Sequence, residues 1–238
     1  MIEIKQIEPT KANLRKFTQF QIDLYDGNPY YVPPLISDDV YTLMPDENPA
    51  FDFCESAYFM AYREGRPVGR IAAIINRQVN EKSGAKDARF GFIDFIDDPA
   101  VSAALLKAAE DWSRKKGMTK IIGPLGFTDL DHEGMLIAGF DELSTMATIY
   151  NYPYYPEHME KLGYKKESDW LEFLMEVPDS IPDKYNRIAE IVKKKYGLKV
   201  LKYTNRKRIK MEYGHALFHL INEAYKDLYQ YSTLTERQ

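Results

Sequence analysis

The sequence is poor in the residues on which disulfide scaffolds and metal sites depend. It has one cysteine, Cys54, and four histidines among its 238 residues. A single cysteine excludes an internal disulfide framework and is compatible with a reducing compartment. Cys54 has no clear catalytic partner in the sequence, so we interpret it as a buried structural thiol. We expect no metal site.

Long apolar runs and a strong net charge are also absent. No stretch is apolar over the length of a bilayer, and the N-terminus has no signal-peptide pattern. The net charge of −4 argues against general binding to nucleic acid or to anionic membranes. We therefore expect a cytoplasmic protein without an integral membrane segment and without a nucleic-acid partner. Its eighteen tyrosines and thirteen prolines instead suggest aromatic-lined pockets and rigid loops.

The most informative stretch, residues 92–124, predicts a strand, a turn, a helix and a second strand. Asp98 is a good N-cap, and Pro99 suits the first helical position because its missing N–H costs nothing there. Gly117 fits the left-handed residue after the last turn. Apolar residues recur at helical spacing, namely Val101, Leu105, Ala108 and Trp112. The stretch therefore predicts a βαβ unit with a parallel pair of strands.

Hydrophobic periodicity predicts regular elements on both sides of this unit. The expected strands cover residues 1–8, 58–62, 68–75, 89–96, 119–124, 170–177 and 198–203. The expected helices cover residues 14–25, 101–116, 157–162, 185–196 and 211–228. Residues 30–53, 79–87 and 126–148 are expected to be connections, and one as long as 30–53 is usually functional or a lid. The fold class is therefore α/β (α+β), with a mixed central sheet and helices on both faces.

We expect a domain of residues 1–178 and an extension of residues 179–238 with the order helix, strand, helix. The strand and helix of the extension parallel those at the start of the chain, which indicates the beginning of a second, truncated domain. The alternative is a C-terminal helix that packs on the first domain. An amphipathic helix needs a surface to cover, so a homodimer is also expected.

The order of elements over roughly residues 1–177 resembles the GNAT acyltransferase superfamily. Residues 58–70 look like its second and third strands, and residues 104–117 look like its main cofactor-side helix. Residues 161–166 look like its closing motif. More narrowly, a bacterial subset of GNAT-like proteins is similar at Gly123-Pro124, Gly139-Phe-Asp141 and Asn151-Tyr-Pro-Tyr-Tyr155. Some members of this subset look like lipid or amine N-acylating enzymes, and many carry two such domains.

The resemblance implies direct attack of an amine on an acyl thioester. The donor would be acyl-CoA, acetyl-CoA or another acyl carrier, and the acceptor a small-molecule or lipid-like amine. Backbone N–H groups at a helix N-terminus would hold the cofactor pyrophosphate. A splayed central strand would polarise the thioester carbonyl, and an acid would protonate the leaving thiolate.

The resemblance also implies the site residues. Tyr154 or Tyr155 would replace the missing acid, and Tyr155 is the expected one. In the acidic loop, Asp131, His132 and Glu133 could each deprotonate an ammonium. Glu133 is the expected base, because it precedes Gly134 and an apolar run that would place it near a pocket rim. The residues expected to bind the cofactor are Phe92, Ile93, Asp94, Phe95, Ile96, Ala100, Val101, Ser102, Asn151 and Tyr154. Aromatic packing under the loop is the alternative for the two tyrosines, and a solvated loop is the alternative for Glu133.

Two features depart from the superfamily pattern. The pyrophosphate turn carries Asp97 and Asp98 where a glycine-rich basic run is usual, and Asp98 is also explained as a helix cap. Met159 stands four residues before Gly163, where a proton-donating tyrosine is frequent.

From the resemblance, the predicted function is a GNAT-fold N-acyltransferase. The alternative is a catalytically inactive GNAT-fold binding or assembly module.

Overall fold

The computed structural model describes residues 1–145 and 148–237. The chain divides into two compact units, each with its own internal contacts. The first comprises Met1–Ser168 and Asn222–Gln238, and the second comprises Asp169–Ile221. Among the described residues, no helix combines the length and the apolar character that crossing a membrane requires.

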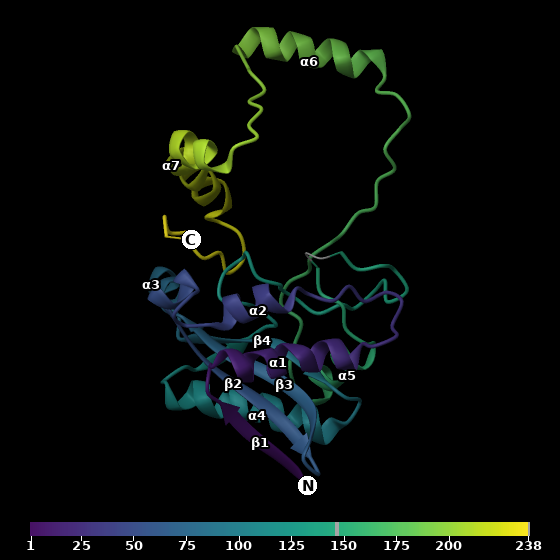
Figure 1. Cartoon of the computed structure of the whole chain (residues 1–238), viewed down its shortest axis with the longest axis vertical. Helices are drawn as coiled ribbons and strands as arrows, with labels where there is room; N and C mark the ends of the chain where they lie inside the picture. Colours follow the sequence, from purple (N-terminus) through teal and green to yellow (C-terminus); the bar gives the residue numbers. More distant parts are fainter. Residues whose placement is uncertain (146–147, 238) are drawn as a thin grey trace. The chain divides into compact units, whose positions relative to one another are not determined.

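A five-stranded sheet in the order β1-β2-β3-β4-β5 forms the centre of the first unit (Figure 1). Successive strands are antiparallel except for β4 and β5, which run parallel. The strands are β1 (Ile2–Ile7), β2 (Cys54–Arg63), β3 (Arg66–Asn76), β4 (Asp87–Phe95) and β5 (Lys120–Ile122). The predicted mixed sheet and its first five strands are therefore confirmed.

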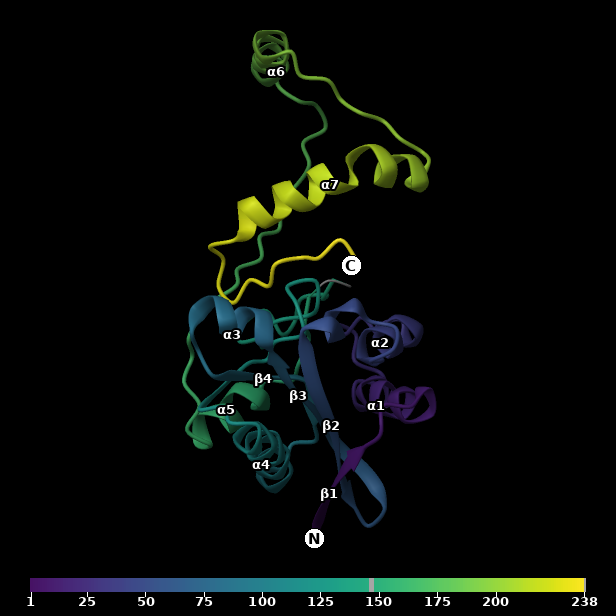
Figure 2. The ribbon, with the colours of Figure 1, turned by 90° about the vertical axis from the view of Figure 1, so that its left-hand side faces the viewer.

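Helices cover both faces of this sheet, as predicted. Figure 2 shows α1 (Lys11–Leu24) and α2 (Ile36–Leu43) on one side of the sheet, and α4 (Pro99–Lys115) and α5 (Tyr154–Lys161) on the other. Each face has its own apolar core, so both sides of the central strands are buried. This explains why β3 and β4 read as nearly continuous apolar runs.

The βαβ unit forms as its sequence signals predict. The Asp98 carboxylate accepts a hydrogen bond from Ala100 N–H at 2.8 Å, and Pro99 is the first helical residue. Leu105 of α4 is fully buried against the sheet. Gly117 adopts a left-handed conformation with φ of 83°, which lets the chain turn directly into β5.

The central strand β4 is kinked by a bulge. Arg70 of β3 lies opposite Asp94, whereas Ala72 lies opposite Gly91. Between these two pairs β4 therefore has one more residue than β3, which is the count of a β-bulge. Phe92, one of the residues at the bulge, has a positive φ of 48°, a conformation that is uncommon outside glycine.

The parallel neighbour β5 accompanies only the first part of β4. Asp87–Arg89 pairs with Lys120–Ile122, and one further hydrogen bond joins Leu125 N–H to Phe90 O at 2.8 Å. A Cβ atom at Gly91 would lie 2.3 Å from Leu125 O, so only glycine permits this close approach. Beyond it, β4 continues without pairing to β5. The structure therefore has the splayed central strand that the family resemblance implies.

Two of the expected connections contain helices, so this part of the prediction was wrong. Residues 30–53 include α2 and the 3₁₀ turn η1 (Pro49–Asp52), and α3 (Arg77–Ser83) overlaps the start of 79–87. These elements have at most eight residues each, so they show little periodicity. Tertiary packing stabilises α2, because its Val40 and Leu43 are buried in the core.

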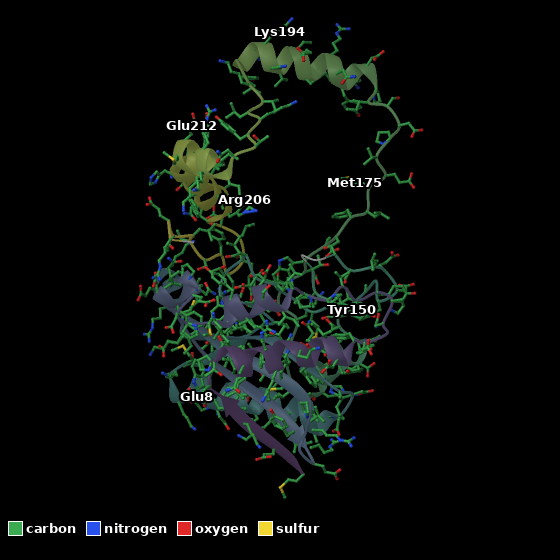
Figure 3. All side chains as sticks on the ribbon, viewed as in Figure 1. Glu8, Tyr150, Met175, Lys194, Arg206 and Glu212 are labelled. Atoms are coloured by element: carbon green, nitrogen blue, oxygen red, sulfur yellow. The ribbon has the colours of Figure 1, made fainter. Side chains whose placement is uncertain are left out.

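The second unit contains α6 (Asp183–Tyr196) and most of α7 (Arg206–Tyr225), which were both predicted. The strands expected at 170–177 and 198–203 are wrong, because neither stretch forms a strand. Every residue of this unit is described, and none of them is buried. Figure 3 shows Met175 on extended backbone without a strand beside it. Alternating apolar residues make a strand only where a neighbouring strand satisfies the backbone. The two interpretations of residues 179–238 stay predictions.

Candidate functional site

A cavity of about 50 Å³ opens beside the bulge of β4, and it has room for a few water molecules. Its walls come from α1, α2, β3, β4, α5 and the loop between β5 and α5. The bulge residues Phe92 and Ile93 form part of the wall. The polar residues that line it are Gln21, Asp39, Arg70, Asp94, His132, Tyr150, Asn151 and Tyr155.

A buried ion pair stands at one wall of the cavity. Arg70 Nε lies 2.8 Å from Asp94 Oδ2, and both side chains are at most 4% exposed. Arg70 also donates to the carbonyl of Phe17 at 3.1 Å. Burial raises the pKa of Asp94, and the charge of Arg70 opposes that rise. Because Arg70 bonds to Oδ2, the second carboxylate oxygen of Asp94, Oδ1, is left to accept from other donors.

Two tyrosine hydroxyls meet at that second oxygen. Tyr25 and Tyr155 donate to Asp94 Oδ1 at 3.2 and 3.4 Å, and the two hydroxyl oxygens lie 2.8 Å apart. Burial, together with the charge of Asp94, raises the pKa of each tyrosine well above its ordinary value. Both hydroxyls therefore keep their protons at neutral pH, and Tyr155 is available as a proton donor.

Helix α5 presses its aromatic residues against the free edge of β4. Ile96 N–H bonds to β3, so the alternation of the strand turns the polar groups of Phe95 away from β3. Phe95 N–H donates to the Tyr155 hydroxyl at 3.1 Å, and the Tyr154 hydroxyl donates to Phe95 O at 2.6 Å. The Tyr155 ring stacks on that of Phe95 with centroids 4.2 Å apart. The two tyrosines therefore both pack and hydrogen-bond at the splay.

The turn before α4 uses up its own N–H groups. Asp98 receives three of them: Ala100 N–H on its carboxylate, and Val101 and Ser102 N–H on its carbonyl at 2.9 and 3.3 Å. Pro99 has no N–H, and the second carboxylate oxygen of Asp98 bonds to Arg63. These bonds lower the pKa of Asp98, with the Arg63 bond the largest cause. A diphosphate of CoA therefore does not fit this turn in the manner that the resemblance implies.

A Ser–His–Asp arrangement lies next to this turn. The two ring nitrogens of His158 contact Ser102 Oγ at 2.9 Å and Asp97 Oδ1 at 3.1 Å. Ser102 is fully buried, and its hydroxyl also donates to Pro99 O at 3.2 Å. Ser102 and His158 do not line the cavity, so these residues fasten α5 to the start of α4 and position the neighbouring tyrosines.

Glu133 belongs to a second charged centre. Its neighbours His132 and Gly134 line the cavity, whereas Glu133 is not among the lining residues. Within the described part of the chain, its buried Oε1 has no hydrogen-bond partner. Burial raises its pKa to about 7, Asp129 adds to the rise, and Arg89 opposes it. A carboxyl group that titrates near neutrality suits proton transfer.

Asn151 fixes the loop that closes the cavity. Its carboxamide accepts from Leu136 N–H at 2.7 Å and donates to Leu136 O at 3.1 Å. Its role in the structure is thus to hold the loop against α5.

Cys54 is buried, its Sγ lies 3.8 Å from Phe127 O, and burial raises its pKa to about 12. That environment agrees with a structural thiol.

The structure brings some of the predicted site residues together and leaves others apart. Five of them line the one cavity: Phe92, Ile93, Asp94, Asn151 and Tyr155. Phe95 and Tyr154 meet each other next to it. The remaining ones, Ile96, Ala100, Val101, Ser102 and Glu133, are absent from its lining. Over the described residues, no group of three or more His, Cys, Asp or Glu is arranged to hold a metal ion.

Sequence reasoning missed four residues of this site: Tyr25, Asp39, Arg70 and His158. Arg70 carried a signal, because it is the one charged residue within the apolar run 68–75, as Asp94 is within 90–96. Opposite charges in two adjacent buried strands predict an ion pair. Tyr25 and His158 had no such signal, because their partners are distant in the sequence. Asp94 lies 69 residues from Tyr25, and Asp97 and Ser102 lie 61 and 56 residues from His158.

Comparison with known proteins gives two curated relatives of similar rank. Protein YghO of Escherichia coli K12 is 32% identical over 229 residues, which are 96% of this chain and 57% of the relative. A bacterial ceramide synthase of Caulobacter vibrioides is 32% identical over 233 residues, which are 96% of this chain and 59% of the relative. The chain thus spans less than three fifths of the length of these relatives. No protein-family model matches it.

Solved structures similar to this chain include a tandem GNAT protein from the clavulanic acid biosynthesis pathway. It is 17% identical, covers 68% of this chain with 43% of its own length, and has a TM-score of 0.45. The chain is similar to this GNAT protein, and its own five-stranded mixed sheet with helices on both faces is the fold class that the sequence predicts.

Proposed function

We propose that this chain carries the acyl-transfer site of an N-acyltransferase, which moves an acyl group from a thioester to an amine. The relative named a bacterial ceramide synthase supports the proposal, because a ceramide is the amide of a long-chain amine. The acceptor would accordingly be a small-molecule or lipid-like amine. The donor would be an acyl thioester, with acyl-CoA or another acyl carrier as its source.

The observation that carries the proposal is the position of Tyr155 at the bulge of β4. Its hydroxyl lies 3.1 Å from the Phe95 nitrogen and reaches the buried carboxylate of Asp94. In the reaction, the amine nitrogen bonds to the thioester carbon, and the carbon–sulfur bond then breaks. Tyr155 would turn its O–H from Asp94 toward the departing sulfur, while the bulged strand polarises the carbonyl.

The amine must lose a proton to attack, and we assign that role to Glu133. Its pKa of about 7 leaves it largely ionised slightly above neutrality, and its buried oxygen has no partner among the described residues. Its neighbours His132 and Gly134 already form the cavity wall.

The rival function is a binding or assembly module without catalysis. It is favoured by the self-satisfied turn at Asp98 and by the two tyrosine hydroxyls that hold the backbone of Phe95. In that case the ordered network would serve only stability. The two functions differ in whether Tyr155 releases its backbone partner when a thioester binds.

The test is an acyl-transfer assay with matched tyrosine variants. Wild-type protein is incubated with a long-chain acyl thioester and a long-chain primary amine, and amide and free thiol are both measured. We expect Tyr155→Phe to lower the rate by roughly 10²- to 10⁴-fold, the usual contribution of a proton donor. Tyr164→Phe is the control, because its hydroxyl bonds to Glu110 at 2.8 Å, away from the cavity lining.

Equal rates for Tyr155→Phe and wild type would remove this residue from the mechanism. No amide from the wild-type protein with any thioester, in a sample that melts cooperatively, would favour the binding module. Because the relatives are longer, the same assay is also run on one of them, where loss of activity in the equivalent variant supports the same assignment.

A further inference from the structure

We propose that the acyl donor is recognised by its acyl-thioester arm, and that the turn before α4 does not bind a nucleotide diphosphate. The inference rests on the proposed function and names its donor class more closely. The donor is an acyl-pantetheine thioester whose affinity does not depend on the adenosine diphosphate portion of CoA. Acyl-CoA and an acylated carrier protein both carry the acyl group on such a pantetheine arm.

The backbone N–H groups at the start of α4 already have hydrogen-bond partners. An anion binds at a helix N-terminus because the first N–H groups have no partner there. In this chain Ala100, Val101 and Ser102 all donate to Asp98, and Pro99 has no N–H to offer. A diphosphate would have to displace the cap before it gained a single backbone bond.

The turn before α4 also carries negative charge. Asp97 and Asp98 place two carboxylates at the position that a diphosphate would approach, and Asp97 has a side chain that is 66% exposed. Arg63 faces the turn, but it is already paired with Asp98. The bond from Asp97 to His158 also holds this carboxylate in place. Like charges that cannot move apart select against an anionic ligand.

The neighbouring edge of β4 offers the backbone donor and acceptor that an amide-containing arm requires. Phe95 N–H and C=O face away from β3, and each is bonded only through a side-chain hydroxyl of α5. The β-alanine unit of a pantetheine arm carries the N–H of one amide and the C=O of the next. It can therefore replace Tyr154 and Tyr155 at these two atoms without leaving either unsatisfied. Recognition of the arm therefore needs no help from the turn.

The experiment compares one acyl group on CoA, on pantetheine and on an acyl carrier protein. Under the proposal, kcat/KM for the acyl-CoA and the acyl-pantetheine agree within about threefold, because the nucleotide adds no binding. A preference for acyl-CoA of about 100-fold or more over acyl-pantetheine would overturn the proposal. A higher kcat/KM for the carrier protein than for either small donor identifies that source.

Thermal unfolding with CoA and with pantetheine gives a readout that does not require catalysis. Equal stabilisation by both at the same concentration supports the proposal, even if no acceptor is acylated. Stabilisation by CoA alone, or by neither compound, contradicts it. The failure of the proposed function appears instead as an absence of amide, so the two failures are distinguishable.

A variant pair tests the turn itself. Asp98→Gly removes one carboxylate and frees Ala100 N–H, so it should raise the affinity for CoA relative to pantetheine. Asp111→Asn is the control, because Asp111 is an exposed residue of the same helix that pairs with Lys107 and Arg114. An unchanged CoA-to-pantetheine ratio in Asp98→Gly would show that the Asp98 cap is not what excludes the diphosphate.

Discussion

Two arginines occupy neighbouring central strands at nearly equal depth, yet their surroundings differ. Arg70 of β3 and Arg89 of β4 are each 2% exposed. Arg70 is neutralised by a carboxylate at 2.8 Å. Arg89 instead donates to the carbonyl oxygens of Gly126, Phe127 and Gln230, at 3.1, 3.4 and 2.8 Å.

The two arginines therefore have different roles. Arg70 positions the polar groups of the cavity, whereas Arg89 holds backbone segments in place. The Arg70–Asp94 pair presents one carboxylate oxygen to Tyr25 and Tyr155, so its charge organises the cavity. Arg89 holds the loop after β5 and the C-terminal segment, where Ser232 N–H also donates to Asp129 at 2.7 Å. Burial lowers the pKa of Arg89, and Asp129 opposes that shift more strongly than any other charge.

The largest effect is expected when the ion pair loses one partner. Asp94→Ala leaves the Arg70 guanidinium buried without its counter-charge, and the free energy of unfolding should fall by about 3–5 kcal/mol. Urea denaturation followed by circular dichroism measures this. The double variant Arg70→Met with Asp94→Leu should lose much less, because it buries no unpaired charge. A loss below about 1 kcal/mol in Asp94→Ala would mean that the pair is not sealed from water.

A smaller loss is expected at the second arginine. Arg89→Met leaves carbonyl oxygens without their donor, at a cost of about 1–3 kcal/mol in unfolding free energy. Hydrogen exchange should rise at residues 230–232, which Arg89 and Asp129 hold in place. The exchange of Asp94 and Phe95 should stay unchanged. Faster exchange at β4 instead would contradict the division of roles between the two arginines.

The smallest stability effect is expected from the titration of Glu133. Its pKa is raised to about 7 in the folded chain, so between the ordinary value of 4.5 and 7 the folded state binds more protons than the unfolded state. Stability should therefore fall as pH rises through that window and then level off. The slope should be shallower than 1.36 kcal/mol per pH unit, because Glu133 is only partly buried.

Glu133→Gln separates that titration from the others, because it replaces the titratable carboxyl group with an uncharged amide of nearly the same shape. Its stability should vary less with pH between 4.5 and 7 than that of the wild type. If Glu133 is the base, acyl transfer by the wild type should also rise with pH up to about 7, and the variant should lose this rise. Identical pH profiles for the two proteins would exclude Glu133 from both roles.

The sequence predicts the βαβ unit well because its signals are local. Asp98, Pro99 and Gly117 determine where α4 begins and ends within one stretch of chain. The bulge is not local, since it appears only when the registers of β3 and β4 are compared. Likewise, Tyr25 reaches Asp94 from a helix whose packing the sequence alone does not reveal. Residues 170–177 show the reverse error, because a pattern typical of a strand forms no strand in the described part of the chain.

A crystal structure with a non-cleavable thioether analogue of the acyl donor would show whether acyl transfer takes place at this cavity. We expect the sulfur within hydrogen-bonding reach of the Tyr155 hydroxyl, about 3.5 Å, with the acyl carbonyl against the bulge at Ile93. Tyr155 would then have released Phe95 N–H. An analogue bound elsewhere, with the Tyr155 hydroxyl still on Phe95 N–H, would contradict acyl transfer at this cavity.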